Sequence, residues 1–571
     1  MKDKKIIILS IVGVLMLVSI VVATSYAYFV ANVSGNKDTN NVVVTNGVMA
    51  LEYKDGDEIT LANAVPGNSV TKTFTVKNTG NVSTNYTIYF SELSNKFVDK
   101  TDLVYTLTSS DGGKNVAQTQ VPDSNEAMVS NYAIDAGKTH TYTLTITFLG
   151  KDENQDDNQG VSFSTKVTIN ETKEYVEPLD IDVELAQGMI PVKFDDSGNV
   201  VVADSNSEWY DYEAHEWANA VLVNCADSAI KSKYFGSNNK VLASAVGKTI
   251  SMDEIMQMYV YIPRYKYRLF NAEDGTSVEQ AINITFESKT TAKSTGTKNG
   301  EWLTHPAFTF GDKELAGIWV GKFETSNTSA LPKILPNVSS LRSMNVSSQF
   351  NTSRLMTTTL ASTYGTSTND DSHMMKNMEW GAVAYLSSSI YGRYINASTC
   401  IDSGCEVWIN NNSNCTTGCA GSSVSASKDS TCNAWNTVTG VNASTTGNIY
   451  GIYDMSGGAE EYVMGNYNAI STAGFSSMPE AKYYDKYTGT DSNRDFTKYH
   501  LGDATKETLK AKSTLQNSWY GDYSESVDWN RPWVSRGGYY NDDTDAGVFN
   551  FGISYGNSFS TISFRVVLGA L

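Results

Sequence analysis

A strict alternation of apolar side chains with threonine is the feature that most restricts the fold of this chain. Residues 141–148 alternate Thr with Tyr, Leu, Ile and Phe, and residues 86–90 and 161–169 also repeat every two positions. Period two in β-branched and aromatic residues predicts strands that bury one face. Turn sequences rich in Pro, Gly, Asn and Asp separate these strands, at 66–68, 78–81 and 135–137. Together they predict a two-sheet β-sandwich over residues 40–172, which we interpret as a spacer domain.

The N-terminus has a sequence typical of membrane targeting. Three lysines within the first five residues precede an apolar run from Ile6 to about Ala23. Such a segment is expected to enter the membrane with its N-terminus inside. Residues 1–29 suit both a cleaved signal peptide, with 25–27 as a small-x-small cleavage site, and a retained membrane anchor. Both interpretations place the rest of the chain outside the cytoplasm.

Composition excludes one large class of partner. The chain has 571 residues, too many for one hydrophobic core, so several domains are expected. Charged residues make up only 18%, and hydroxyl and amide side chains supply much of the polarity. The net charge of −19 opposes contact with phosphate groups, so we expect no nucleic-acid partner.

Residues 66–80 read Pro-Gly-Asn-Ser-Val-Thr-Lys-Thr-Phe-Thr-Val-Lys-Asn-Thr-Gly, and residues 26–29 read Tyr-Ala-Tyr-Phe. Both segments resemble the camelysin-like and biofilm-fibre family of Gram-positive exported proteins. The resemblance implies an extracellular location on the surface of a Gram-positive bacterium, either anchored or secreted. Some members of that family polymerise by strand donation, so a fibre or matrix subunit built through the sandwich is an alternative function.

The second domain is expected over residues 186–571, after a polar linker at 173–178 that contains a proline. Apolar residues at helical spacing predict a helix within 373–391, and a second short helix is expected near 208–221. The remainder consists of short apolar runs between long Gly-, Asn- and Ser-rich loops. This pattern predicts an α+β fold with long loops.

Four blocks in this domain occur in a specific order. They are Asn-Ile-Tyr-Gly-Ile-Tyr-Asp-Met-Ser-Gly-Gly-Ala-Glu-Glu-Tyr-Val at 448–463, Gly-Ile-Trp-Val-Gly-Lys-Phe-Glu at 317–324, Arg-Gly-Gly at 536–538 and Phe-Arg-Val at 564–566. The set resembles the formylglycine-generating enzyme, or sulfatase-modifying factor, family. The resemblance implies a C-type-lectin-like fold.

The catalytic residues of that family are missing. Its oxidases use a cysteine pair between the Arg-Gly-Gly and Phe-Arg blocks to bind copper, and residues 536–564 contain no cysteine. Its iron-dependent relatives use a His-x-x-x-His-x-Glu cluster, and none of the five histidines is so spaced. Gly458 stands where the family's calcium site has a side-chain oxygen, although Glu461 is kept. We therefore predict no catalytic residue, no metal site and no cofactor; a peptide-cysteine oxidase, testable by oxygen uptake, is the alternative.

Two other regions rich in possible metal ligands have simpler explanations. The acidic loop at 151–158 lacks the oxygen spacing and the glycine of an EF-hand, so we expect a solvated hairpin tip. Five cysteines crowd one Asn-, Ser- and Gly-rich loop without the close pairs that zinc requires. Disulfides are therefore expected among Cys400, Cys405, Cys415, Cys419 and Cys432, with the pairing open.

The stretch 539–562 contains no Lys, Arg, Glu, Gln, Met or Trp and is rich in Tyr, Asn, Ser, Asp and Gly. Antibody paratopes use this composition, because Tyr gives a large contact area at low entropic cost. Each residue can be encoded by a codon that starts as AAC and changes only at its adenines, or is a fixed Gly, Ala, Val or Phe. With its flanking blocks, the stretch resembles the variable region of diversity-generating retroelement target proteins. The alternative is a polar β-turn region that closes the domain.

Within this stretch Val548, Phe549 and Phe551 are predicted to belong to the core. The expected ligand contacts are Tyr539, Tyr540, Asn541, Asp542, Asp543, Asp545, Asn550, Ile553, Ser554, Tyr555, Asn557, Phe559 and Ser560. His373, which follows two aspartates and a serine, is interpreted as part of a helix N-cap rather than as a catalytic residue. The sequence as a whole predicts a surface-displayed receptor or adhesin that binds an unknown protein or glycan at its C-terminal surface and contacts the membrane through its N-terminal helix.

Overall fold

The computed structural model describes residues 33–35, 41–44, 47–54, 66–79, 84–135, 137–158, 161, 163–171, 181, 183–207, 209–394, 404–512 and 517–569. The chain divides into two compact units, Met1–Leu179 and Asp180–Leu571. The signal peptide or anchor predicted at 1–29 lies outside the described residues. Within the described ranges, no helix is both long enough and apolar enough to cross a membrane.

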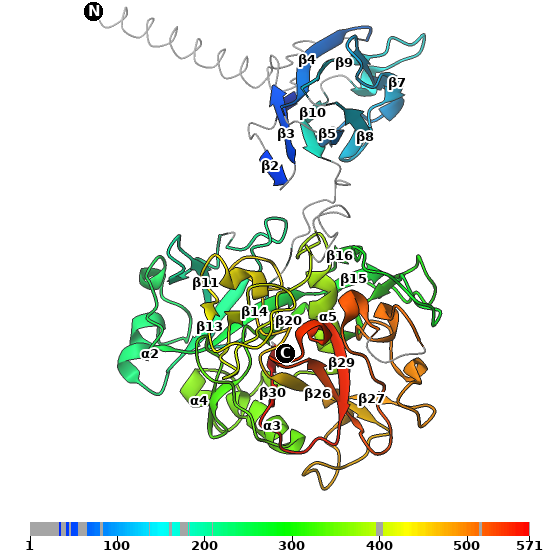
Figure 1. Ribbon diagram of the computed structural model, residues 1–571. Coiled ribbons are helices and arrows are strands. Elements are labelled where there is room, and N and C mark those ends of the chain that lie inside the picture. Colours follow the sequence, from blue (N-terminus) through cyan, green and yellow to red (C-terminus); the bar gives the residue numbers. More distant parts are fainter. Residues whose placement is uncertain are drawn as a thin grey trace, which may run out of the picture. The chain divides into compact units, whose positions relative to one another are not determined.

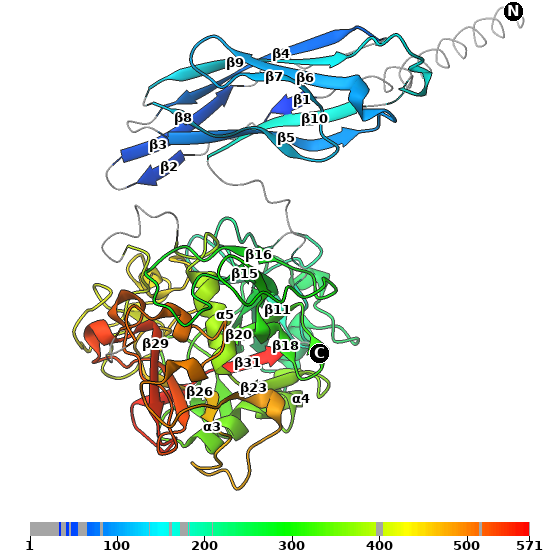
Figure 2. The same ribbon diagram turned by 90° about the vertical axis from the view of Figure 1, so that its right-hand side faces the viewer.

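The first unit contains two β-sheets that face each other (Figure 2). One sheet has the order β1 (Val33–Gly35), β10 (Phe163–Glu171), β5 (Thr84–Asn95), β8 (Glu126–Ile134). The other has the order β2 (Asn41–Val44), β3 (Gly47–Lys54), β4 (Ser69–Asn78), β9 (Thr139–Phe148), β6 (Leu103–Ser109), β7 (Val116–Gln120). The Thr-alternating segment forms β9, whose Tyr, Leu, Ile and Phe side chains are buried between the sheets while its threonines are half-exposed.

Both ends of the acidic loop at 151–158 are held by contacts with other residues of the first unit. The Lys151 ammonium lies 3.2 Å from the Asp99 carboxylate and also pairs with buried Asp102. Asn158 is buried; its side chain accepts from the Val98 amide and donates to Asp102. The acidic side chains between these anchors are exposed, as expected of a solvated tip.

Two large sheets organise the second unit (Figure 1). The seven-stranded sheet has the order β12 (Val200–Val202), β11 (Ile190–Phe194), β13 (Asn219–Val223), β14 (Ile255–Pro263), β20 (Gly317–Gly321), β31 (Val566–Gly569), β23 (Asp371–Met374). The other has the order β27 (Asp485–Tyr487), β26 (Glu460–Tyr467), β28 (Trp533–Gly537), β29 (Gly547–Ser554), and β30 (Ile562–Phe564) also pairs with β26.

Smaller elements complete the unit. Four small sheets comprise β15 (Tyr265–Arg268), β16 (Ile284–Phe286) and β17 (Trp302–Thr304); β18 (Thr309–Phe310) and β19 (Lys313–Glu314); β21 (Ser326–Thr328) and β22 (Leu331–Lys333); β24 (Cys419–Ala420) and β25 (Asn433–Ala434). The α-helices are α2 (Ser228–Tyr234), α3 (Val346–Ser353), α4 (Ala361–Tyr364) and α5 (Asn377–Ser387). Helix α5 is buried throughout and contacts both β14 and β26, so it connects the two large sheets.

The predicted fold class was an N-terminal membrane helix followed by a β-sandwich and an α+β lectin-like domain; the sandwich is present in the first unit, but the α+β prediction is wrong. The second unit is mostly β-sheet, its α-helices have 4 to 11 residues, and no membrane helix is present among the described residues. The predicted helix near 208–221 is instead a turn, closed by Asp211 and Glu216, that leads into β13. Val221 and Val223 are β-branched residues, which favour strands, and in β13 they pair with β14 through backbone hydrogen bonds. A helix at this position would lack those bonds. The apolar stripe within 373–391 does form a helix, α5.

Candidate functional site

The C-terminal stretch forms β28, β29 and β30 and two loops between them. Strand β29 runs antiparallel to β28, with Gly547 opposite Gly537 and Ser554 opposite Trp533. Strand β30 pairs with β26 on the side away from β28. The chain therefore makes a first loop, residues 538–546, between β28 and β29. A second loop, residues 555–561, carries it past β28 and β26 to β30.

A buried arginine stands at each end of this stretch. The Arg536 guanidinium is fully buried and donates to the Ala504 carbonyl at 3.1 Å. The Arg565 guanidinium is also fully buried, donates to the Gly321 carbonyl at 2.8 Å and pairs with the Glu461 carboxylate. The Arg-Gly-Gly and Phe-Arg blocks therefore fix the ends of the stretch to the core.

The second loop presents its side chains to solvent. Tyr555 is 45% exposed and Phe559 is 39% exposed. Asn557 and Ser560 are exposed too. Together with Trp529, which is 64% exposed, Tyr555 and Phe559 are the exposed aromatic side chains among the residues whose burial is described. Exposed aromatic residues gathered beside small polar ones are typical of binding surfaces.

The backbone of the second loop is held by donors that lie outside it. Five of its carbonyl oxygens accept hydrogen bonds from the rest of the unit. The pairs are Val346 N to Gly556 O at 3.1 Å, Tyr462 Oη to Asn557 O at 3.0 Å, Ser343 N to Phe559 O at 2.9 Å, Arg342 Nη1 to Ser560 O at 2.8 Å and Glu460 N to Thr561 O at 2.9 Å. Side chains of the loop contribute to none of these bonds, so its conformation depends on the scaffold around it.

The first loop is held largely by one of its own side chains. The Asp542 carboxylate accepts from the Tyr539 amide at 3.0 Å, and the Tyr540 amide donates to the Gly458 carbonyl at 3.0 Å. Burial, together with the nearby carboxylates of Asp545 and Asp543, raises the pKa of Asp542 to about 6, although the hydrogen bond from the Tyr539 amide lowers it. Among the predicted contacts in this loop, Asn541 and Asp543 are exposed, while Tyr539, Tyr540, Asp542 and Asp545 are half-buried.

Two of the predicted contact residues face the interior. Asn550 is 3% exposed and donates to the Asp545 carbonyl at 2.8 Å. Ser554 is 8% exposed and shares a hydrogen bond of 2.7 Å with the Tyr462 hydroxyl. Both therefore support the backbone, and we correct their assignment as contacts; Ile553 is half-buried. The predicted core residues Val548, Phe549 and Phe551 are buried, which confirms that prediction.

Glu460, which the sequence did not single out, lies between the two loops. Its amide bonds to the second loop, and its half-buried carboxyl is close enough to Asp542 in the first loop for the two charges to interact. Burial and, to a smaller extent, the charge of Asp542 raise the pKa of the Glu460 carboxyl to about 7, while a hydrogen bond with Ser535 opposes the shift. A Cβ on Gly552 would lie 3.2 Å from its Oε1, so the glycine leaves room for this carboxyl. The only sequence signal was its place beside Glu461 in the 448–463 block.

Comparison with known proteins adds no relative. No family model matches the chain, and no curated protein matches it. One solved structure with some likeness is described as "AvmM Catalyzes Macrocyclization in Alchivemycin A Biosynthesis". It shares 11% identity and a TM-score of 0.12 over 25% of this chain and 100% of that chain. A likeness this weak carries no argument about fold or function.

The calcium site implied by the 448–463 block is replaced by buried acids. A Cβ on Gly458 would lie 2.6 Å from Glu324 Oε1, so a side chain carrying an oxygen does not fit there. Burial, followed by the charges of Asp454 and Glu461, raises the pKa of Glu324 well above its usual range. In the described ranges no group of three or more His, Cys, Asp and Glu side chains is arranged to hold a metal ion.

His373 lies in strand β23, so its predicted role in a helix N-cap is wrong. Its Nδ1 is 2.8 Å from Asp371 and its Nε2 is 3.0 Å from Glu379. The two carboxylates raise the pKa of this buried imidazole to about 9 although burial opposes the charge. Glu379 also accepts from the Lys376 amide and so caps α5 itself. This buried ion-pair cluster joins β23 to α5.

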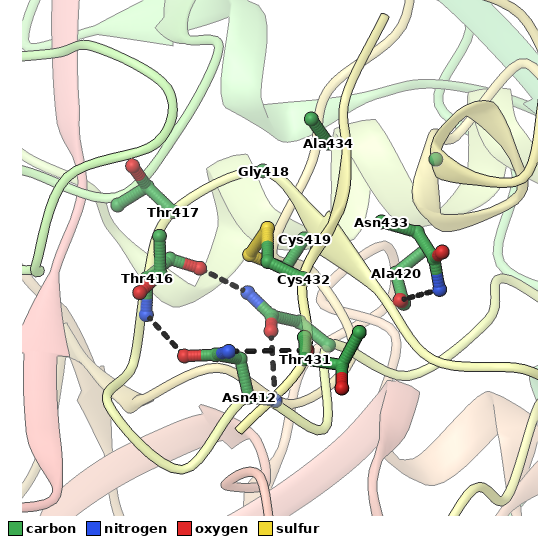
Figure 3. Close-up of a disulfide and its surroundings, with 12 residues drawn as sticks. Asn412, Thr416, Thr417, Gly418, Cys419, Ala420, Thr431, Cys432, Asn433 and Ala434 are labelled. Carbon is green, nitrogen blue, oxygen red and sulfur yellow. Dashed lines mark hydrogen bonds between the residues drawn. A yellow bond between two sulfur atoms is a disulfide. The ribbon is translucent and has the colours of Figure 1, made fainter. Parts of the chain in front are cut away.

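The cysteine-rich loop contains the disulfide Cys419–Cys432, which links β24 to β25 (Figure 3). Cys405 is disulfide-bonded too, and Cys400 lies outside the described residues. Cys415 is a buried free thiol, so its prediction as a disulfide partner is wrong. Burial raises its pKa to about 12. Two of the predicted cysteines therefore pair with each other, and a third serves as a buried side chain.

Proposed function

We propose that this protein is a surface-displayed binding protein whose two C-terminal loops contact a protein or glycan ligand. The exposed side chains of the loops are Tyr, Phe, Asn, Asp and Ser, which combine aromatic contact area with adaptable hydrogen bonding. The proposed contacts are Tyr539, Tyr540, Asn541, Asp542, Asp543, Asp545, Ile553, Tyr555, Asn557, Phe559 and Ser560, together with Glu460 between the loops. Binding requires no cofactor.

The observation that carries this proposal is the way the second loop is held. Its five bonded carbonyls meet donors from Arg342, Ser343, Val346, Glu460 and Tyr462, all outside residues 539–562. A loop fixed through its carbonyls keeps its backbone when its side chains change. Such a loop supports diversification of its side chains, because new ones alter the surface without removing the bonds that shape it.

Sequencing of codons 530–571 across a population of the host tests whether the loops are diversified. Buried residues of the same types as the exposed ones serve as matched controls. Asn557 and Ser560 are exposed, whereas Asn550 and Ser554 are the same residue types and are buried. We expect substitutions at template adenines to concentrate at the exposed pair and to spare the buried pair. Equal variation at both pairs, or variation no greater than at codons 448–463, contradicts the proposal.

A binding measurement tests recognition directly. The purified second unit and a variant with Tyr555, Asn557, Phe559 and Ser560 changed to serine or alanine are applied to the same glycan array and the same displayed peptide library. Glycans or peptides retained by the native protein and lost by the variant support the proposal. Signals that the loop variant retains in full assign binding to another surface.

A further inference from the structure

One short segment of the chain forms hydrogen bonds with both the cysteine-rich insertion and the second loop. We use "insertion" for residues 404–434 and "bridging segment" for residues 337–343. We infer that Arg342 is a positioning residue which transmits the rigidity of the insertion to the second loop and so sets the placement of its contact side chains. The inference rests on the proposed function only in that the second loop meets the ligand; the coupling itself is measurable without one.

The insertion pairs with the bridging segment through backbone hydrogen bonds. Ser340 N donates to Cys415 O at 3.0 Å, and Thr417 N donates to Val338 O at 2.8 Å. Asn337 N donates in turn to Thr417 O at 2.9 Å. Ladder bonds of this kind fix the bridging segment to the insertion over its whole first half.

The other end of the bridging segment holds the second loop. The Ser343 amide donates to Phe559 O at 2.9 Å, and Arg342 Nη1 donates to Ser560 O at 2.8 Å. These carbonyls belong to consecutive residues whose side chains are exposed. The orientation of both side chains therefore follows the position of residues 342 and 343.

The Arg342 guanidinium joins the three segments in one place. Besides Ser560 O, its Nη1 lies 3.3 Å from Cys415 Sγ in the insertion. Its Nη2 donates to Asn414 O at 3.3 Å and to Ser339 Oγ at 3.1 Å. A planar guanidinium offers several donors in a fixed fork, so it orients all these acceptors relative to one another, which a lysine ammonium does not do.

The part of the insertion that Arg342 contacts is itself fixed. The Asn412 side chain accepts from the amides of Asn414 and Thr416 at 3.1 and 3.3 Å and donates to the Thr431 carbonyl at 3.1 Å. The Cys419–Cys432 disulfide joins the residues that follow Gly418 and Thr431, as Figure 3 shows. Asn414 and Cys415 thus form a rigid support, and Arg342 extends it to the second loop.

Hydrogen exchange on the purified full chain measures the coupling. The amides of Ser343 and Glu460 bond to carbonyls of the second loop, so their exchange reports how firmly the loop is held. Arg342→Ala is expected to speed exchange in peptides covering 341–347 and 458–464 by about tenfold, because it removes a charge-assisted donor. Arg342→Lys is expected to recover only part of the protection. Arg268→Ala, at an exposed arginine that bonds the Gly300 carbonyl, is the matched control and should leave both peptides unchanged.

A double-mutant cycle separates coupling from general loosening. Replacing both Cys419 and Cys432 by serine should speed exchange at Ser343 and Val346, within 341–347, when Arg342 is present and add little when it is alanine. Additive effects, or Arg342→Ala without effect on these peptides, overturn the inference. If the cysteine variant does not fold, Arg342→Ala alone still decides, since it must also speed exchange at Ser340 and Thr417 on the insertion side.

These outcomes are independent of the proposed function. If population sequencing shows no diversification but exchange shows the coupling, the insertion supports a loop that is not a diversified site. If diversification is found without coupling, the binding proposal stands and Arg342 is an ordinary surface arginine.

Discussion

The two C-terminal loops differ in what determines their shape. The first loop relies on its own Asp542, whose carboxylate accepts from the Tyr539 amide. The second loop relies on donors from two distant segments, residues 342–346 and 460–462, and its side chains at 555 and 557–560 are exposed. A substitution in the first loop therefore risks changing the backbone, whereas the second loop is expected to tolerate new side chains at its exposed positions 555, 557, 559 and 560. Both loops face solvent, so exposure alone does not identify the positions that are free to vary.

The largest effect is expected from Gly538→Ala in the first loop. Gly538 has φ +68°, and a Cβ there would lie 2.8 Å from the Ala546 Cα, so the strain of a left-handed residue is joined by a backbone clash. We expect a loss of about 3 kcal/mol in the free energy of unfolding, measured by urea denaturation.

Gly247→Ala is the control for that substitution. Gly247 has φ +78° and open space around the added Cβ, so only the conformational strain remains, about 1 kcal/mol. Equal losses for the two variants would show that the first loop moves aside freely and does not depend on Gly538.

Tyr462→Phe tests the scaffold of the second loop. The buried hydroxyl donates to the Asn557 carbonyl at 3.0 Å and accepts from the Ser554 hydroxyl at 2.7 Å, so its removal takes a donor from Asn557 and an acceptor from Ser554. We expect a loss of about 1.5 kcal/mol and faster hydrogen exchange at Ser343 and Val346. Tyr555→Phe, at an exposed tyrosine of the loop itself, should change neither quantity.

Asp542→Asn tests the first loop through pH. Because burial raises the pKa of Asp542 from 3.8 to about 6, the folded state holds the proton more tightly than the unfolded chain. The stabilisation is complete below pH 3.8 and is lost as pH rises through 6. Asparagine keeps an acceptor without the charge, so the variant should match the native protein near pH 3.5 and exceed it by about 1 kcal/mol at pH 7. Thermal unfolding of both proteins from pH 3.5 to 7 measures this difference in stability. A difference that does not depend on pH, or the same trend in Asp543→Asn, contradicts the assignment of the pH dependence to Asp542.

The difference between the loops also shows how much of the candidate site the sequence could predict. Composition indicates an exposed, aromatic and polar surface, and alternation assigns Val548, Phe549 and Phe551 to the core. Asn550 and Ser554 are the same residue types as Asn557 and Ser560. The sequence does not show which pair is buried, because that depends on how β29 pairs with β28 and where β29 ends.

The residues that hold the second loop could not be predicted from the sequence, for a different reason. Arg342 and Ser560 are 218 positions apart, and Tyr462 and Asn557 are 95 apart. Neither pair lies in a shared local pattern, so no periodicity brings them together. The α+β prediction failed similarly: of the two expected helices only that at α5 is present, and long-range strand pairing dominates the domain.

The smallest effect on the free energy of unfolding is expected from the exposed side chains of the second loop, where the two loops differ most. Replacing Tyr555, Asn557, Phe559 and Ser560 one at a time by alanine should change the free energy of unfolding by less than about 0.5 kcal/mol each, since these exposed side chains donate none of the bonds that hold the loop carbonyls. The same replacement at buried Asn550 and Ser554 should cost about 1–2 kcal/mol through lost hydrogen bonds. Urea denaturation of the six variants separates the groups. A destabilisation at Tyr555 or Phe559 as large as that at Asn550 would mean that the aromatic side chains brace the loop, and the second loop would then resemble the first.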